Sequence, residues 1–252
     1  MEPLEGLGLL AAAFAAGAIN AVAGGGSLVS FPALLAAGYA SRSANVTNTV
    51  ALWPGYLSGS FGYRAELRLQ RARVVRLAIP SLAGAAVGSA LLLGTPESAF
   101  ESVVPFLILF ACALMAFQGP LASFALRHRL VAEAGSVPPL LFVGIFLVAV
   151  YGAYFGAGLG ILTLALLAIL LPDDLQRSNA LKGMLSLVIN SLAFAYFVAF
   201  GPVRWLPAAV MALGSLAGGY LGVGVARRLG VRLLRVVVIA YGLVVVAVLF
   251  VR

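Results

Sequence analysis

The chain has 252 residues, of which 63% are hydrophobic and only 10% are charged, and its formal net charge is +8. A soluble domain needs about 25% charged residues to cover its surface, so this composition excludes a secreted, cytosolic or nucleic-acid-binding protein. The mean hydropathy of +1.10 indicates that the surface of this protein faces a lipid bilayer and not water.

Ten apolar runs follow one another along the chain. They cover about residues 6–23, 27–40, 44–63, 74–94, 100–118, 137–157, 159–171, 183–200, 206–226 and 233–251. A helix that spans a bilayer needs roughly 20 such residues, and the runs 27–40 and 159–171 are too short. Each follows a glycine cluster, at residues 24–26 and 156–160. Because glycine costs about 1 kcal/mol per helical residue relative to alanine, we predict that both clusters break a helix inside the membrane.

An offset of 134 residues relates the two glycine clusters and recurs elsewhere in the chain without gaps. The matching pairs are Gly24 and Gly158, Gly26 and Gly160, Asn45 and Asn179, residues 81–84 and 215–218, and Gly88 and Gly222. Such agreement in one register indicates an internal duplication. We therefore predict a first transmembrane repeat over 1–119, a cytoplasmic linker over 120–135 and a second repeat over 136–252. The linker contains Arg127, His128 and Arg129.

The distribution of the fifteen arginines predicts how the repeats face, because cytoplasmic loops carry the excess of basic residues. If each broken element is a hairpin that returns to its own side, twelve arginines fall on one side and only Arg42, Arg204 and Arg252 on the other. If each broken element is a single crossing, the division is nine against six. We therefore expect an all-α multi-pass membrane protein with its N-terminus outside. It would contain two inverted repeats, each with three transmembrane helices and one glycine-broken hairpin.

The two breaks are the first candidates for a binding site. A helix that restarts inside the protein presents free backbone amides and about half a positive charge, which suits an anion. The residues predicted to contribute are Gly25, Gly26, Ser27, Gly158 and Gly160. The alternative is that these glycines only let helices pack closely. Their duplication at one offset favours the binding interpretation.

Polar side chains follow each break and are the second set of candidates. They are Asn45, Thr47, Asn48, Asn179 and Lys182, with Asn48 aligned to Lys182 by the offset. Lys182 is the only lysine, and an ionisable group in a span indicates function because its burial costs several kcal/mol. The alternatives are a lysine that snorkels to the interface and asparagines that cap helix N-termini.

Two further sets of residues receive other predictions. Tyr56 and Asn190 are aligned by the offset and either line a pathway or form interhelical hydrogen bonds. The spacing of Ser81, Gly84 and Gly88 and of its copy predicts close helix packing.

The absence of other chemistry narrows the function. All eight acidic residues fall in loops or at the ends of apolar runs, and the single cysteine, Cys112, lies inside one. We find no metal cluster, no nucleophile next to a base and no phosphate-binding loop. The sequence therefore predicts a protein that is not an enzyme and needs no cofactor or metal. The acidic start, Glu2 and Glu5, is unlike a signal peptide, so we expect the first run to be retained.

The chain resembles the TauE/SafE family of sulfite exporters and anion permeases. The resemblance rests on residues 23–27 (Ala-Gly-Gly-Gly-Ser), 31–35 (Phe-Pro-Ala-Leu-Leu) and 44–48 (Ala-Asn-Val-Thr-Asn), with a weaker copy at 156–160. It covers nearly the whole chain. It implies transport of sulfite or an organosulfonate such as sulfoacetate, usually outward across the bacterial inner membrane. Lys182 stands where the first motif has Asn48, which is a departure between the two halves.

Taken together, the residues and the resemblance predict a secondary transporter that exports a small sulfur-containing oxyanion by alternating access. Its expected partners are the anion, the bilayer and a second copy in a homodimer. An anion channel, or an uptake permease for another small organic anion, is the alternative. A membrane enzyme or sulfur carrier that uses Cys112 is a further hypothesis, under which Cys112→Ser would abolish function.

Overall fold

The computed structural model describes residues 2–22, 24–117, 119–120, 123–124, 137–171, 173, 175–229 and 231–251, and these residues contain helices and no strand. The helices are α1 (Pro3–Val22), α2 (Ser27–Ala36), α3 (Ser41–Phe61), α4 (Arg64–Arg68), α5 (Arg71–Gly94), α6 (Glu97–Ala116), α8 (Pro139–Tyr154), α9 (Leu159–Leu170), α10 (Leu175–Phe200), α11 (Trp205–Leu229) and α12 (Val231–Val251). The predicted all-α class is confirmed. The linker residues Arg127, His128 and Arg129 lie outside the described part, as does the side chain of Arg252.

Four of the described helices are long and apolar enough to cross a bilayer. They cover Pro3–Ala21, Arg71–Gly94, Glu97–Ala116 and Gln176–Phe200, and five shorter apolar helical segments accompany them in the described part of the chain. At 1.5 Å per residue, a helix of 20 residues spans about the 30 Å of a hydrocarbon core. The chain is a multi-pass membrane protein.

Each glycine break reverses the chain direction and forms a helical hairpin. In the first hairpin, Tyr39 beyond the end of α2 donates its hydroxyl to Glu5 Oε1 near the start of α1, at 3.2 Å. Partial burial and the neighbouring Glu5 carboxylate raise the pKa of Tyr39, so its hydroxyl stays a donor at physiological pH. In the second hairpin, α8 and α9 run antiparallel because Gly144 faces Leu166 while Gly152 faces Leu159.

The short return helices are only about half as long as a bilayer core is thick. With 10 residues in α2 and 12 in α9, they extend only about 15 and 18 Å. The breaks that precede them therefore lie in the protein interior, where non-helical backbone is tolerated only if protein or a cavity surrounds it.

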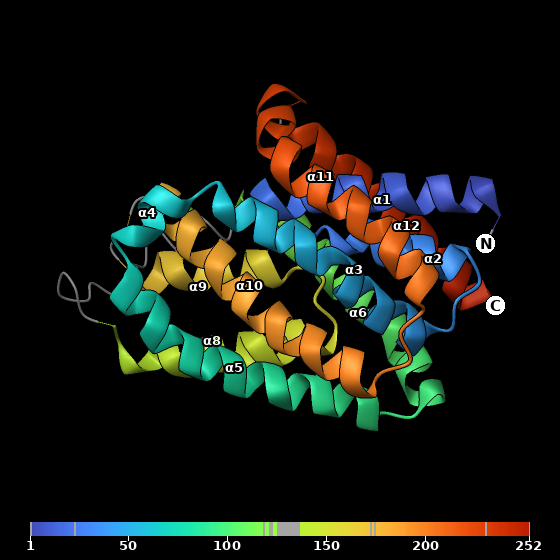
Figure 1. Ribbon diagram of the computed structural model, residues 1–252, viewed down its shortest axis with the longest axis horizontal. Coiled ribbons are helices and arrows are strands. Elements are labelled where there is room, and N and C mark those ends of the chain that lie inside the picture. Colours follow the sequence, from blue (N-terminus) through green and yellow to red (C-terminus); the bar gives the residue numbers. More distant parts are fainter. Residues whose placement is uncertain are drawn as a thin grey trace.

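Small residues allow close packing in two of the helix pairs, α5 with α8 and α1 with α11. Gly84 and Gly88 of α5 lie directly against backbone carbonyls of α8, and Gly218 of α11 lies against the Phe14 carbonyl of α1. The predicted close packing is confirmed at these positions, while Gly222 falls among residues whose side-chain environment is not described. Figure 1 shows α5 and α8 along one edge of the molecule, and α1 and α11 along the opposite edge.

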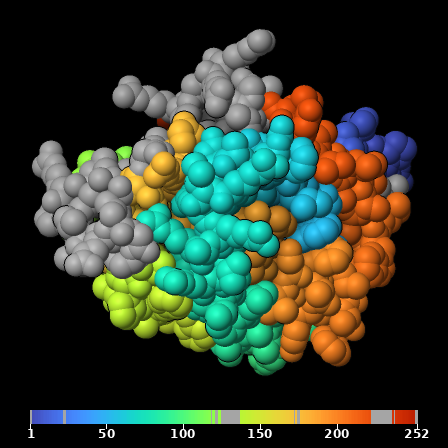
Figure 2. All heavy atoms as spheres, turned by 60° about the vertical axis from the view of Figure 1, so that its left-hand side comes forward, coloured from blue at the N-terminus to red at the C-terminus, as the bar shows by residue number. Residues whose placement is uncertain are grey.

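Equivalent helices of the two halves run antiparallel to each other. Trp53 of α3 donates to Ser191 Oγ of α10 at 2.9 Å and stacks on Phe194 with ring centroids 4.9 Å apart. Near the other end of the pair, Val46 lies beside Gly201. The packing partners are also exchanged between halves, since α1 packs on α11 as α8 packs on α5. Both observations are expected of inverted repeats, whose orientation and boundaries stay predictions. Figure 2 shows α5 exposed beside α8 and α10.

The two ends of the helix bundle differ in charge and are each tied together by a salt bridge. At the arginine-poor end, Arg42 Nε lies 3.3 Å from Glu97 Oε2. At the arginine-rich end, Arg73 lies 2.5 Å from Asp173, and the short helix α4 forms where only a polar connection is predicted.

Candidate functional site

The two glycine breaks touch each other in the interior of the protein. A Cβ atom built on Gly24 would lie 2.8 Å from Gly160 Cα, and one built on Gly160 would lie 2.9 Å from Gly24 Cα. Two backbones can approach this closely only if neither residue has a side chain. The two breaks that the sequence singles out as binding-site candidates are therefore in contact.

At the first break, some backbone amides donate hydrogen bonds within the protein and others do not. Gly24 and Gly25 have φ values of +77° and +94°, a conformation that non-glycine residues rarely adopt. The Gly26 amide donates to Asn20 Oδ1 at 2.7 Å, so it is already occupied. Within the described chain no acceptor is found for the amides of Gly25 and Ser27. Among the described residues, the amides of Gly25 and Ser27, and not that of Gly26, are left open to a ligand at this break.

The second break starts α9 from a left-handed glycine. Gly158 caps the helix with φ +84°, and the amides of Ile161 and Leu162 both bond to its carbonyl. The Gly160 amide has no acceptor among the described residues. Ser27 Oγ lies 4.0 Å from the position that a Cβ on Gly156 would take, so the start of α2 reaches the second break.

Lys182 lies against this junction. Its side chain passes over Gly160, with Cδ 3.6 Å from the position of a Cβ atom there. The residue is 2% exposed, and its Nζ atom has no hydrogen-bond partner in the described part of the structure. The snorkelling hypothesis is wrong, because an interfacial lysine would keep its amine in water. An unpaired buried ammonium is costly, and an anion bound beside it would offset this cost.

The three asparagines are buried or partly buried and retain unused polar atoms. Asn45 Nδ2 donates to the Tyr154 carbonyl at 2.8 Å, whereas the Oδ1 atoms of Asn45, Asn48 and Asn179 have no partner in the described structure. The capping hypothesis is wrong for Asn45 and Asn179, since α3 begins at Ser41 and α10 at Leu175. Asn45 instead fixes the end of α8, just before the second break. This bond uses one of the two N–H groups of the Asn45 amide and ties that side chain to α8, whereas Asn48 and Asn179 have no such tie among the described residues.

Thr47 forms a hydrogen bond away from the glycine junction. Its Oγ1 accepts a hydrogen bond from the Arg204 amide at 3.0 Å. This bond joins α3 to the connection between α10 and α11. The structure therefore gives Thr47 a tertiary bond at the arginine-poor end.

Three polar residues near the junction are not among the sequence candidates. Asn20 receives the Gly26 amide, and the hydroxyl oxygens of Ser30 and Ser60 are buried without a partner in the described structure. Asn20 is the one polar side chain in the apolar run 6–23, which is the signal that identifies it. Ser30 and Ser60 have no such signal, because isolated serines are common in membrane helices.

A small cavity, lined in part by polar side chains, lies beside the junction. Its volume is about 20 Å³, and its lining includes Asn20, Tyr56, Ser60 and Asn179. This volume holds about one water molecule and is too small for a multi-atom anion. Tyr56 faces this cavity, and its side chain also interacts with that of Asn190 on α10. Asn190 Nδ2 donates to the Ser186 carbonyl of its own helix at 2.8 Å.

The groups that the described residues bring to the junction are of the kind that suits an anion. It offers amide donors, a lysine and reorientable amides, and the described carboxylates lie outside it. Among the described residues no group of histidine, cysteine or acidic side chains is arranged to hold a metal.

The comparisons with known proteins identify the class. The fold defines a multi-pass membrane protein, and relatives at 25 to 28% identity are membrane transporters by name. A "Probable membrane transporter protein" of Haemophilus influenzae is 28% identical over 231 residues, covering 92% of this chain and 89% of the relative. The "Probable membrane transporter protein ORF9" of a Sinorhizobium species is 28% identical, with 90% and 85% covered. YfcA of Escherichia coli K12, with the same description, is 25% identical, with 90% and 82% covered.

The family follows from the sequence model that matches. The model for the sulfite exporter TauE/SafE matches residues 9–249, so the chain belongs to this family. It is a membrane transporter and not an enzyme. No solved structure is significantly similar to it.

Proposed function

We propose that the protein moves a small sulfur-containing oxyanion, such as sulfite or sulfoacetate, across the bacterial inner membrane by alternating access. The observation that carries this proposal is the contact between Gly24 and Gly160 beside the unpaired, buried Lys182. The name of the matching family supplies the substrate class.

The sign of the substrate charge follows from the groups that remain unused. The amides of Gly25, Ser27 and Gly160 and the amine of Lys182 are all donors. Each hydrogen bond from such a group to a charged oxygen contributes about 1.5 to 3 kcal/mol. A tetrahedral or pyramidal oxyanion has enough oxygens to accept several of these bonds at once, whereas a metal cation would find no carboxylate.

We infer that the N-terminus lies outside and that transport runs outward. The bundle separates an arginine-poor end near Arg42 from an arginine-rich end near Arg73, and the rich end is expected in the cytoplasm. Export of an anion from a negative-inside cell gains about 2.3 kcal/mol per charge per 100 mV. Export therefore needs no coupled ion. The antiparallel pairing of α3 with α10 supports a rocking movement of one half against the other.

A binding and flux experiment tests the proposal. Purified protein is screened for thermal stabilisation by sulfite, thiosulfate, sulfate, sulfoacetate and small carboxylates. The best ligand is then followed in proteoliposomes by counterflow, in which unlabelled anion inside drives uptake of labelled anion. Saturable, trans-stimulated flux is expected for a carrier. Flux that never saturates would indicate a channel, and stabilisation by carboxylates alone would refute the sulfur-containing substrate.

A further inference from the structure

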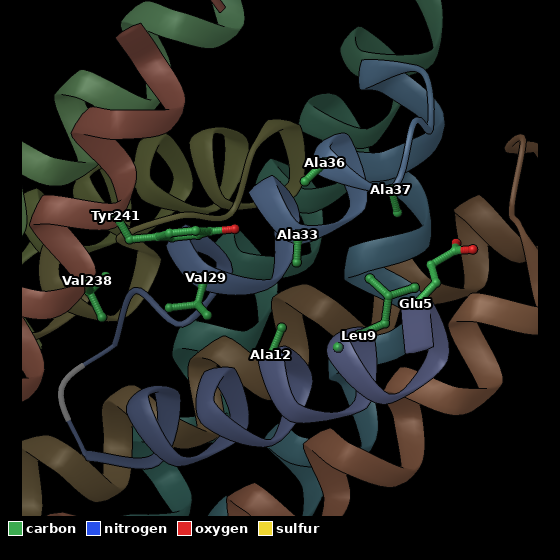
Figure 3. A pocket seen from close by; sticks show the side chains of 10 residues that line it. Glu5, Leu9, Ala12, Val29, Ala33, Ala36, Ala37, Val238 and Tyr241 are labelled. Atoms are coloured by element: carbon green, nitrogen blue, oxygen red, sulfur yellow. The ribbon is translucent and has the colours of Figure 1, made fainter. Parts of the chain in front are cut away.

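A groove on the lipid-facing side lies between α1, α2 and α12, away from the glycine junction. Its volume is about 540 Å³, within the roughly 300–1,000 Å³ of small-molecule pockets. Figure 3 shows Glu5 near one end and Tyr241 and Val238 near the other, with alanines along the walls. Gly8, which lines the groove on α1, is itself exposed, so this face of the membrane-spanning bundle is open to lipid.

Small residues create the groove at positions where the second half of the chain has large ones. The small residues that line it on the two helices of the first hairpin are Gly8, Ala12, Ala33, Ala36 and Ala37. The residues 134 positions later are Phe142, Phe146, Leu167, Leu170 and Leu171. The three leucines are buried in an apolar cluster, so the second hairpin is filled where the first is hollow. A Cβ atom on Gly8 would meet nothing within 4 Å.

Glu5 places a carboxylate at the mouth of the groove, and the charge of Arg204 also reaches the neighbouring Tyr39. Glu5 accepts one hydrogen bond from the Tyr39 hydroxyl and one from the Glu2 amide, both at 3.2 Å. A carboxylate has about four acceptor positions, so Glu5 retains capacity for a cationic donor. Glu2 is exposed at the same end of α1, and no lysine or arginine is among the residues that line the groove.

We propose that this groove binds a phospholipid whose headgroup carries an amine, of the phosphatidylethanolamine class. One acyl chain lies against the alanines of α2 and the small residues of α1, where it buries apolar surface that would otherwise be unfilled. The ammonium group lies at Glu5. The site is independent of the anion site, because none of its lining residues belongs to the two glycine breaks.

Native mass spectrometry of the full chain, purified in mild detergent, tests this assignment. Phosphatidylethanolamine and phosphatidylglycerol with identical acyl chains are added in equal amounts. We expect the wild type to retain phosphatidylethanolamine two- to fivefold more than phosphatidylglycerol, the range of a partly exposed ion pair. The double variant Ala33→Leu/Ala36→Leu, which introduces the side chains of the second half, is expected to lose most bound lipid of either kind.

Two further variants separate the headgroup and the groove from general effects. Glu5→Gln leaves the groove intact, and we expect it to bind both lipids equally. Ala83→Leu/Ala86→Leu adds the same atoms on the exposed face of α5 and is expected to bind lipid as the wild type does. If the filled variant does not fold, Glu5→Gln still tests the headgroup assignment in an intact groove.

Several results would overturn the proposal. The first is equal retention of both lipids by the wild type, and the second is unchanged lipid retention by the filled variant. The third is a wild-type dimer that carries no lipid and becomes a monomer in the filled variant, which would show that a second copy of the chain occupies the groove. Sulfite stabilisation is expected to be unchanged in all these variants. A wild type that binds lipid but no anion would refute the proposed transport and leave the lipid site standing.

Discussion

Gly24 and Gly160 lie against each other although 136 residues separate them in the chain, and neither position has room for a methyl group. Each belongs to a break that reverses a helical hairpin, so the contact joins the interior ends of both hairpins. Where two backbone segments are in direct contact, neither can move aside for an added atom as a flexible side chain can. The junction is therefore a rigid point about which the halves are positioned, and it is beside this point that Lys182 is buried.

Replacing Gly160 by alanine tests the junction. Gly160 is helical, so alanine causes no backbone strain there, but its Cβ atom would lie 2.9 Å from Gly24 Cα. We expect the breaks to be pushed apart, with a loss of about 1–3 kcal/mol of stability and of anion-induced stabilisation. The measurement is the thermal midpoint with and without sulfite. Gly94→Ala is the matched control, because nothing lies within 4 Å of its Cβ position. An unchanged midpoint for Gly160→Ala would contradict the close contact.

Replacing Lys182 by methionine separates binding from folding. Methionine keeps the length of the side chain over Gly160 and removes an unpaired buried amine, so we expect unchanged or raised stability. Loss of one charged donor weakens anion binding by about 10- to 150-fold. Isothermal titration with sulfite and sulfoacetate measures the change. Wild-type affinity in Lys182→Met would remove the lysine from the site.

Asn45 and Asn48 are expected to respond in opposite ways. Asn45→Ala removes the 2.8 Å bond to the Tyr154 carbonyl and leaves a carbonyl at the end of α8 unpaired, which costs about 1–3 kcal/mol. Asn48→Ala removes an amide whose Oδ1 has no partner in the described structure, so it is expected to weaken anion binding with little change in stability. Thermal midpoints and sulfite titrations of both variants provide the comparison. Equal stability losses would mean that Asn48 also has a structural role.

The predicted orientation is tested by labelling single cysteines. Glu101→Cys at the start of α6 and Gln176→Cys near the start of α10 are both exposed positions, placed in a Cys112→Ala background. We expect a membrane-impermeant thiol reagent to label position 101 in intact cells and position 176 only after permeabilisation. The reverse pattern would place the N-terminus inside. The buried Cys112 is not expected to be needed for sulfite binding, so the background variant should bind as the wild type does.

Several features were predictable because their causes are local. The helical class follows from hydrophobic runs long enough to span lipid, and the two breaks follow from glycine clusters that a helix does not tolerate. The close packing at Gly84 and Gly218 follows from small residues at a spacing of one helical turn. The short helix α4 was missed, because a five-residue polar segment has no periodicity to detect.

The amino-acid sequence by itself determined where helices span, where they break and which single lysine enters the membrane, because these depend on composition and on neighbours along the chain. Only the tertiary structure decided that Gly24 contacts Gly160, that Asn45 donates to the Tyr154 carbonyl and that Lys182 is buried without a partner among the described residues. Those properties arise between segments more than 20 residues apart, where the approach of two backbones depends on how every helix packs.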